Sequence, residues 1–382
     1  MTTSQGLRDA LADRLRASGD LEDPAWMHAA QGVPREVFVS DGFMRPLPGT
    51  HPTLYEAVKP TDEGWLEGVY EDVTLITQLD GHVSAFDLVE PTAGDPTSSS
   101  TLPSLVLRMW HQLGVTGGQR VLEIGTGTGY STALGCHRLG DANITSVEVD
   151  PDNAERAAGA LKGLGYAPRL LVGDGLDARL IDGSYDALIA TCAVRYIPYG
   201  WLDQITVGGT VLVTLGGWMG GYGLVKLTVT GRGCATGRFL PGTTELMIAR
   251  PHGRPPRPPL VLLSGQGKGS RFSPALLDGW TARWVAQLAV PNAERLGGGV
   301  HQVLSDVGTG SLAYSNDRVD DDGNPLVTQR GPIPLWDRVS EALIQWQEAG
   351  TPHQSGFGIT ITPKSQTVWL GDEAGPSWRL PV

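Results

Sequence analysis

The chain has 382 residues with 52 glycines and 27 prolines, yet 40% of its residues are hydrophobic and 11 are tryptophan, which excludes a collagen-like or wholly disordered protein. Its formal net charge is −12, and residues 101–382 carry 24 acidic against 23 basic side chains, so the sequence offers no basic face for a nucleic acid. No apolar segment reaches the ~20 residues of a membrane helix, and the cysteines and histidines lack metal-binding spacing. We therefore expect a cytoplasmic protein without a metal ion and without a membrane or nucleic-acid partner.

Residues 1–104 are predicted to form an N-terminal region of short elements and long loops. In chain order the patterns predict helices over 7–17 and 24–31, a loop over 41–65, strands over 73–76 and 83–88, and a Ser/Thr/Pro-rich loop over 91–104. The Asp80-Gly81 pair predicts the turn between the two strands. Residues 51–100 contain 10 acidic side chains against the single basic Lys59, which concentrates the acidity of the chain in this region.

Residues 105–250 alternate between helices and strands that are nearly all apolar. Strands are predicted over 120–124, 144–149, 169–172, 185–191, 210–215 and 224–230, and helices over 105–113, 130–139 and 151–163. This alternation predicts an α/β fold with a doubly wound, mostly parallel sheet of the Rossmann-like type.

The remaining residues, 251–382, are predicted to form a C-terminal α+β extension. It begins with a Pro-rich linker at 251–259. It continues with an apolar segment at 260–263, helices over 274–289 and 335–349, a solvated acidic loop at 317–322, and a hairpin of strands 357–362 and 367–370. We expect the tryptophans of this region to belong to its core rather than to a peptide groove: Trp336, Trp346, Trp369 and Trp378.

A glycine-rich loop, Gly125-Thr126-Gly127-Thr128-Gly129, follows the first strand of the predicted sheet and opens the next helix. Glycines let a backbone turn sharply and approach a ligand closely, but dinucleotide-binding enzymes use a similar loop at the same place. The loop alone therefore leaves both kinds of ligand open.

Three carboxylates at the ends of successive strands favour S-adenosylmethionine (SAM). Glu123 would repel a pyrophosphate but suits the ammonium and sulfonium of SAM. Glu148, which lies 25 residues later, is placed to accept hydrogen bonds from ribose hydroxyls, and Asp174 is placed to accept one from the adenine amino group. Each carboxylate alone could be a cap or turn residue, but ligands of open α/β sheets bind at these strand ends.

The sequence thus predicts a class I SAM-dependent methyltransferase whose product is S-adenosylhomocysteine. The residues expected to bind the cofactor are Glu123, Gly125, Thr126, Gly127, Gly129, Tyr130, Glu148, Val149, Asp174, Gly175 and Thr191.

Several further segments resemble the protein-L-isoaspartate O-methyltransferase family. They are Val33-Pro-Arg-Glu-Val-Phe-Val39, the Tyr70-Glu71-Asp72 triplet, the segment RVLEIGTGTGYSTA at 120–133, and Arg238-Phe239-Leu240-Pro241. The resemblance covers roughly residues 7–250 and implies a carboxyl O-methyltransferase.

The same resemblance implies which residues meet the substrate. Where the family carries a Thr-Ile-Ser-x-Pro loop, this chain has Ser99-Ser100-Thr101-Leu102-Pro103. Thr101 is the expected catalytic residue, with Ser100 and Ser99 as supporting donors; the alternative is a solvated turn that caps the following helix. After the strand at 185–191, Val194, Arg195 and Tyr196 are expected to contact the substrate peptide. Arg195 either pairs with a carboxylate of that peptide or lies free on the surface.

Three departures from the family resemble a specialised branch that tailors ribosomally made lanthipeptides and graspetides. The first is Thr101, which stands where the family has a serine. The segment between Val39 and Thr97 is longer than in the family, and about 130 residues follow its usual end. This resemblance implies methylation of an aspartate in a modified precursor peptide, closure of the ester to a succinimide (aspartimide), and hydrolysis to isoaspartate.

Other functions remain open from the sequence. They are repair of L-isoaspartyl residues in damaged proteins, methylation of a small molecule or RNA, and a non-catalytic peptide-binding protein. The expected organisation is an N-terminal region with an acidic insertion (1–104), a SAM-binding core (105–250), and an extension that recognises the peptide (251–382). We expect the acidic insertion to border the peptide entrance; a solubilising surface is the simpler alternative.

Overall fold

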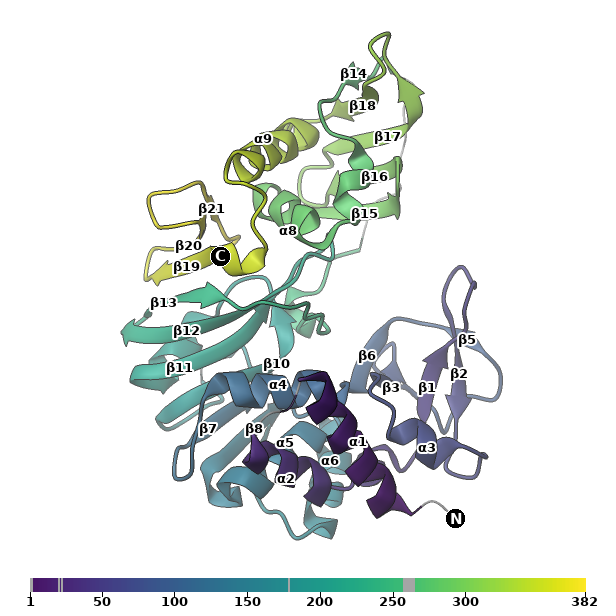
Figure 1. Cartoon of the computed structure of the whole chain (residues 1–382), viewed down its shortest axis with the longest axis vertical. Helices are drawn as coiled ribbons and strands as arrows, with labels where there is room; N and C mark the ends of the chain where they lie inside the picture. Colours follow the sequence, from purple (N-terminus) through teal and green to yellow (C-terminus); the bar gives the residue numbers. More distant parts are fainter. Residues whose placement is uncertain (1–2, 20, 22, 178, 257–264) are drawn as a thin grey trace. The chain divides into compact units, whose positions relative to one another are not determined.

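The computed structural model describes residues 3–19, 21, 23–177, 179–256 and 265–382, which form two compact units (Figure 1). Unit 1 comprises Met1–Thr191 and Asp203–Leu212, and unit 2 comprises Cys192–Leu202 and Val213–Val382. The chain passes between them at three points, within the strand β10 (Tyr185–Val194), the helix α7 (Tyr199–Gln204) and the strand β11 (Ile205–Leu215). This division differs from the predicted one, because the N-terminal region and the cofactor half of the predicted core share unit 1. The predicted linker lies partly, and the apolar segment 260–263 wholly, outside the described residues.

The parallel sheet of unit 1 has the strand order β10-β7-β8-β9. Its other strands are β7 (Val121–Ile124), β8 (Ile144–Glu148) and β9 (Arg169–Val172), and its connecting helices are α5 (Tyr130–Leu139) and α6 (Pro151–Gly163). β7 pairs in parallel with both neighbours, so Glu123 stands beside Ile189 on one side and Ser146 on the other. The predicted strands and helices of this part are confirmed, because their continuous apolar runs are buried by the helices.

The N-terminal helices pack against this half of the fold. α1 (Ser4–Ser18) and α2 (Pro24–Gly32) confirm the two predicted helices, and α4 (Pro103–Leu113) confirms the third. α2 begins with Pro24 after Asp23, whose side chain accepts a hydrogen bond from the amide of Ala25 as an N-cap. The rings of Trp26 and Trp110 stack with centroids 5.3 Å apart and fasten α2 to α4. The short helices η1 (Arg35–Val39) and η2 (Asp141–Asn143) complete this part.

The acidic insertion forms a separate six-stranded sheet with the order β4-β3-β1-β2-β5 and with β6 paired to β3. Its elements are β1 (Phe43–Pro46), β2 (Leu54–Val58), α3 (Trp65–Val69), β3 (Leu75–Leu79), β4 (Val83–Ser84), β5 (Thr92–Ala93) and β6 (Pro96–Ser100). The Asp80-Gly81 turn is confirmed, with φ of 51° and 78°. A small core of Met44, Leu79, Ala85 and Leu88 holds the sheet together.

The loops predicted over 41–65 and 91–104 are therefore wrong. These strands are short and rich in Gly, Pro, Ser and Thr, so they lack the alternating pattern on which a strand prediction depends. β6 is held as a strand by β3, from which it is about 20 residues distant in sequence, and that non-local pairing leaves no local signal.

Unit 2 contains an antiparallel run in the order β21-β20-β19-β13-β12. The strands are β12 (Gly223–Gly231), β13 (Cys234–Phe239), β19 (Phe357–Thr362), β20 (Ser365–Leu370) and β21 (Ser377–Arg379), with the short helices α7 (Tyr199–Gln204), η3 (Arg250–His252) and η5 (Gln354–Gly356). The predicted C-terminal hairpin is confirmed as β19 and β20.

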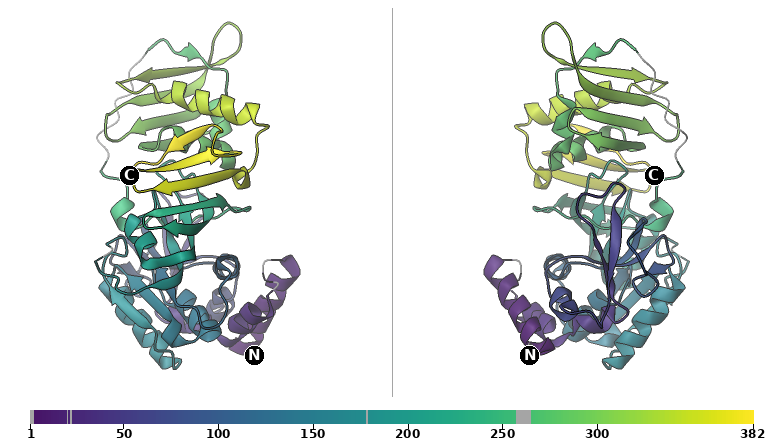
Figure 2. Two further views of the ribbon diagram at one scale, coloured as in Figure 1. Left: turned by 90° about the vertical axis from the view of Figure 1, so that its left-hand side faces the viewer. Right: turned by 90° about the vertical axis from the view of Figure 1, so that its right-hand side faces the viewer.

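A second antiparallel sheet of unit 2 has the order β14-β18-β17-β16-β15. Its strands are β14 (Lys268–Gly269), β15 (Ala293–Gly298), β16 (His301–Asp306), β17 (Leu312–Val319) and β18 (Pro325–Arg330). Figures 1 and 2 show α8 (Trp280–Ala289), which follows η4 (Pro274–Asp278), and α9 (Leu335–Glu348) on one side of this sheet. The two predicted helices are confirmed, but the strands were missed, and β17 extends into the predicted acidic loop at 317–322. Trp336, Trp346 and Trp369 are buried, as expected, whereas Trp378 is only half-buried.

Among the described residues, no helix combines the length and the apolarity that crossing a bilayer requires.

Candidate functional site

The glycine-rich loop makes a tight turn at the carboxyl end of β7. Gly125, Gly127 and Gly129 have φ of 98°, 56° and 95°, a left-handed region that other residues adopt only with strain. The amides of Gly125 and Thr126 donate to the carbonyl of Val147 on β8, at 2.8 and 3.1 Å. The loop is thus fixed to the neighbouring strand, and a Cβ on Gly127 would find only the carbonyl oxygen of Ser99, 3.6 Å away. Its glycine leaves room for a ligand that approaches the backbone.

Glu123 lies directly beneath this loop and is 0% exposed. Its Oε2 accepts hydrogen bonds from Thr132 Oγ1 (2.5 Å) and Ser146 Oγ (2.7 Å), while no described residue is bonded to Oε1. Burial raises the pKa of this carboxyl, and the hydroxyls of Ser131, Thr132 and Ser146 partly oppose the shift. An orphaned carboxylate oxygen beneath a ligand loop is what a cationic ligand would satisfy.

Glu148 ends β8 and holds the loop from the other side. Its Oε2 accepts from the amide of Gly127 (2.7 Å), and its Oε1 accepts from the amide of Asp150 (3.0 Å). Asp150 caps α6 and accepts a further hydrogen bond, at 3.1 Å, from Gln78 of the inserted sheet. The insertion is therefore tied directly to the turn that follows Glu148.

The other residues expected to bind the cofactor surround the same strand ends. Thr126 exchanges a hydrogen bond with Ser146 at 2.7 Å, and the Thr191 hydroxyl donates to the carbonyls of Ile124 and Gly125. Asp174 accepts from the amide of Leu176 at 2.9 Å, in a turn of its own.

The last three complete this edge. Tyr130 is buried, and burial raises its pKa to about 12. Val149 follows β8 and is 38% exposed. Gly175 packs closely against the end of β7, because a Cβ at this position would lie 2.8 Å from the side chain of Ile124. The structure thus brings every residue of the predicted cofactor set to one edge of the parallel sheet.

The Ser/Thr segment reaches the same edge as the end of β6. Ser99 lies with its carbonyl next to Gly127, whereas Ser100 is 1% exposed. Within the described part of the chain, no group is bonded to the hydroxyls of Ser99 or Thr101, both of which are half-buried. The capping alternative is wrong, because α4 has no side-chain cap from this segment and Asp72 accepts from the Ser104 amide instead.

Arg35 holds this segment in place and was not singled out from the sequence. It is 0% exposed, and its guanidinium donates six hydrogen bonds. Three of them reach Ser100 Oγ (3.2 Å), the Ser100 carbonyl (2.9 Å) and the Thr101 carbonyl (3.2 Å). The other three reach the carbonyls of Val69, Glu71 and Val73 at 2.8–3.0 Å. The available signal was the position of Arg35 in the segment 33–39, where every other residue except Glu36 is apolar.

Burial lowers the pKa of Arg35 to about 10, so it stays charged at neutral pH. No described carboxylate forms an ion pair with Arg35, so backbone carbonyls are the main groups that stabilise its charge. Thr132 and Ser146, which hold Glu123, were also missed; hydroxyls within apolar elements gave the only hint.

Val194, Arg195 and Tyr196 belong to unit 2. The Arg195 guanidinium donates to the carbonyl of Pro291 (2.9 Å) and to Asn292 Oδ1 (2.6 Å), and it lies 3.6 Å over the ring of Trp218. The ring of Tyr196 packs at a tilt of 48° against His252 with centroids 4.4 Å apart, and Val194 is fully buried. These contacts exclude the alternative of a free surface arginine, whereas pairing of Arg195 with a peptide carboxylate stays a prediction.

A cavity of about 440 Å³ opens beside the glycine loop within unit 1. Gly127 and Thr128 contribute one wall, α6 a second, and η1 with strands of the inserted sheet the rest. Part of the insertion therefore shapes the surroundings of the cofactor loop.

The geometry fits SAM. The left-handed glycines leave the backbone bare, Glu123 offers an unpaired oxygen to a cation, and Glu148 and Asp174 stand at the ends of the next two strands. No group of three or more potential metal ligands occurs in the described ranges.

Comparisons with known proteins define the class and then the family. The fold is that of a class I SAM-dependent methyltransferase. A family model described as protein-L-isoaspartate(D-aspartate) O-methyltransferase matches residues 74–222. Protein-L-isoaspartate O-methyltransferases are similar in sequence: that of Ignicoccus hospitalis is 33% identical over 162 residues, 42% of this chain and 76% of the relative. That of Xanthomonas campestris pv. campestris is 30% identical over 226 residues, 59% of this chain and 81% of the relative. The chain belongs to the protein-L-isoaspartate O-methyltransferase family and is a SAM-dependent carboxyl methyltransferase.

A solved protein-L-isoaspartate O-methyltransferase has a similar fold, with a TM-score of 0.55 and 19% identity. The match takes in 96% of this chain and all of the solved chain. The region after the methyltransferase core of this chain therefore lies within the part that matches the fold of a solved family member.

Proposed function

We propose that the chain methylates the free carboxylate of L-isoaspartyl residues in polypeptides. The family model and the named relatives support this substrate over an aspartate in a precursor peptide. The observation in the structure that carries the proposal is the convergence of two elements. The hydroxyl-bearing end of β6 lies against Gly127 of the cofactor loop, and the buried Arg35 fixes it there.

The reaction requires orientation more than proton transfer. A carboxylate is already ionised at neutral pH, so it needs no general base. When bound, SAM supplies an electrophilic methyl group, which passes to a carboxylate oxygen as the sulfonium becomes a neutral thioether. The chain must hold the carboxylate in line and strip its water.

Thr101 is the proposed catalytic residue, because its hydroxyl can donate to the carboxylate without neutralising it. Ser99 is a second donor, next to the glycine loop. Ser100 is buried and bonded to Arg35, so we assign it to positioning rather than to contact with the substrate.

Three carboxylates are proposed to recognise the cofactor. Glu123 faces its positive charge, Glu148 its ribose, and Asp174 its adenine. The amides now bonded to Glu148 already preset its orientation.

The test uses one peptide sequence synthesised with isoaspartate or with aspartate. With SAM, the isoaspartyl peptide should gain one methyl group and then lose methanol as the following amide closes a succinimide. The aspartyl twin should stay unchanged. Methylation of the aspartyl peptide alone would contradict the proposal.

A second candidate is the tailoring of a ribosomally made peptide at aspartate. The inserted sheet favours this candidate, because β6 is the last of its six strands and carries the Ser99 and Ser100 hydroxyls. Macrocyclic aspartyl peptides are the discriminating substrates: turnover of these, with none of linear isoaspartyl peptides, would select this candidate. Family membership argues against the non-catalytic alternative.

A further inference from the structure

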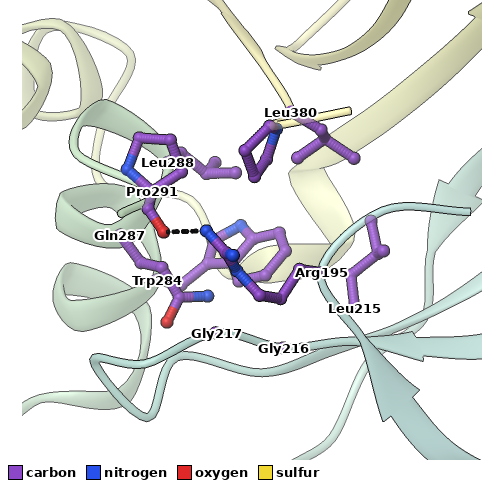
Figure 3. A pocket seen from close by; sticks show the side chains of 10 residues that line it. Arg195, Leu215, Gly216, Gly217, Trp284, Gln287, Leu288, Pro291 and Leu380 are labelled. Atoms are coloured by element: carbon purple, nitrogen blue, oxygen red, sulfur yellow. Dashed lines mark hydrogen bonds between the residues drawn. The ribbon is translucent and has the colours of Figure 1, made fainter. Parts of the chain in front are cut away.

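A small cavity in unit 2 is lined by two nitrogen donors without partners. It has a volume of about 20 Å³ and lies between the segment after β11, the helix α8, and the C-terminal residues Leu380 and Pro381 (Figure 3). Arg195 and Trp284 both point into it. Among the described residues, none accepts a hydrogen bond from Arg195 Nε or Trp284 Nε1, and both atoms are buried.

The two donors are held rigidly. Arg195 is fixed by its contacts to Pro291, Asn292 and Trp218. Trp284 is 1% exposed and packs edge-on against Phe239 with centroids 5.0 Å apart. Their N–H groups therefore cannot turn away to find another acceptor, and a buried donor without an acceptor is costly.

The charge of the site selects the kind of acceptor. The Arg195 guanidinium forms no ion pair with any described carboxylate, and its burial lowers its pKa, as expected for a cation without a counter-ion. The other walls are mostly apolar: Leu215, Leu288, Leu380 and Pro381. The Gln287 side chain is held by hydrogen bonds with both backbone groups of Gly221, and neither Arg195 Nε nor Trp284 Nε1 is bonded to it.

The size of the cavity limits the ligand. A cavity needs about 10–15 Å³ to hold one water-sized group, so a space of about 20 Å³ takes one or two oxygen atoms, and the rest of a larger ligand must remain outside it. A water would accept both hydrogen bonds but would leave the guanidinium without a counter-charge. A carboxylate supplies acceptor oxygens and the missing negative charge together.

We propose that this cavity is a carboxylate-binding site, in which Arg195 Nε–H and Trp284 Nε1–H donate to the oxygens of one carboxylate group. The residues that line the site all belong to unit 2, and none of them belongs to the proposed methyl-transfer site. It does not depend on the proposed function. The carboxylate belongs either to a small free acid or to the end or a side chain of a polypeptide, and the two sources share this chemistry.

Nuclear magnetic resonance of the full chain labelled with ¹⁵N tests the site. The indole signal that disappears in Trp284→Phe is that of Trp284, and it should shift on titration with sodium formate but not with sodium chloride at equal ionic strength. Arg195→Gln should weaken the formate affinity about tenfold or more, as expected for loss of a charged hydrogen bond. Trp65→Phe identifies the matched control signal, because Trp65 in unit 1 also has an indole N–H without a partner among the described residues. The Trp65 signal should not shift with formate.

A second titration distinguishes the sources. A short peptide with a free carboxyl end is compared with the same peptide as its amide, and a response to the acid form only would assign the site to polypeptide ends. A response to formate but to neither peptide would assign it to small acids. No shift of the Trp284 signal with formate or peptide, or an equal response of wild type and Arg195→Gln, would overturn the proposal and leave a hydrated cavity.

Discussion

Replacement of Arg35 should loosen the end of β6 and slow methyl transfer. Arg35→Lys keeps the charge but has three donors where Arg35 makes six hydrogen bonds, so at least three are lost. At about 1 kcal/mol net for each hydrogen bond, the local cost is ~3 kcal/mol. That corresponds to roughly a hundredfold rise in local opening.

Arg35→Met should cost more, about 5 kcal/mol, because it also leaves five carbonyls without their donor. Hydrogen exchange of the amides of residues 97–102, measured by mass spectrometry, reports this opening directly. In the same variants kcat should fall by roughly ten- to a hundredfold, since small displacements of orienting groups are costly, while SAM affinity changes less.

The matched control is Arg14→Lys. Arg14 is exposed and donates a single hydrogen bond of 2.8 Å, to the carbonyl of Tyr70 near the same turn. Its replacement should change stability by no more than about 0.5 kcal/mol. If Arg35→Lys shows wild-type exchange over 97–102 and wild-type kcat, then Arg35 does not hold the substrate strand and the reasoning fails.

Four further outcomes follow from the site. Thr101→Ala should lower turnover with SAM affinity largely kept, and Thr101→Ser should restore it; unchanged turnover in Thr101→Ala would refute the assignment. Burial raises the pKa of Glu123 above its unfolded value, so its contribution to stability falls as pH rises from about 4.3 through the folded value. Glu123→Gln should remove that fall in melts across pH and weaken SAM binding in calorimetry; an unchanged pH dependence would contradict it. Gly127→Ala should lower the free energy of unfolding by about 1–2 kcal/mol, because alanine is strained at a φ of 56°. It should also weaken SAM binding, and intact binding would show that the loop does not bind the cofactor. Neutralising the exposed Glu63 and Glu67 as glutamines should change KM for charged peptides and its salt dependence if the insertion borders the entrance, whereas equal KM would leave it a solubilising surface.

The cofactor half of the fold could be predicted from the sequence because its signals are local. Apolar strands, a glycine loop and carboxylates at strand ends occur within about 75 residues between β7 and β10. Parallel strands necessarily bring their carboxyl ends to one edge. The sequence alone was therefore enough to predict that residues such as Glu123 and Glu148 lie close together.

The parts that escaped prediction depend on contacts between distant segments. β6 is a strand because β3 pairs with it, and Arg35 matters because the turn at 69–73 and the residues Ser100 and Thr101 meet around it. Neither fact leaves a period in the local sequence. Arg195 illustrates the same limit, since its position is set by Pro291, Asn292 and Trp218, far away along the chain.

The most direct measurement is the transfer of a labelled methyl group to a matched pair of peptides. SAM with a deuterated methyl group is incubated with the chain and with the isoaspartyl or the aspartyl form of one sequence. The account predicts label on the isoaspartyl peptide only, in an ester that mild alkali releases as deuterated methanol. Label that appears only on the aspartyl peptide, or that resists alkali, would contradict carboxyl methylation of isoaspartate.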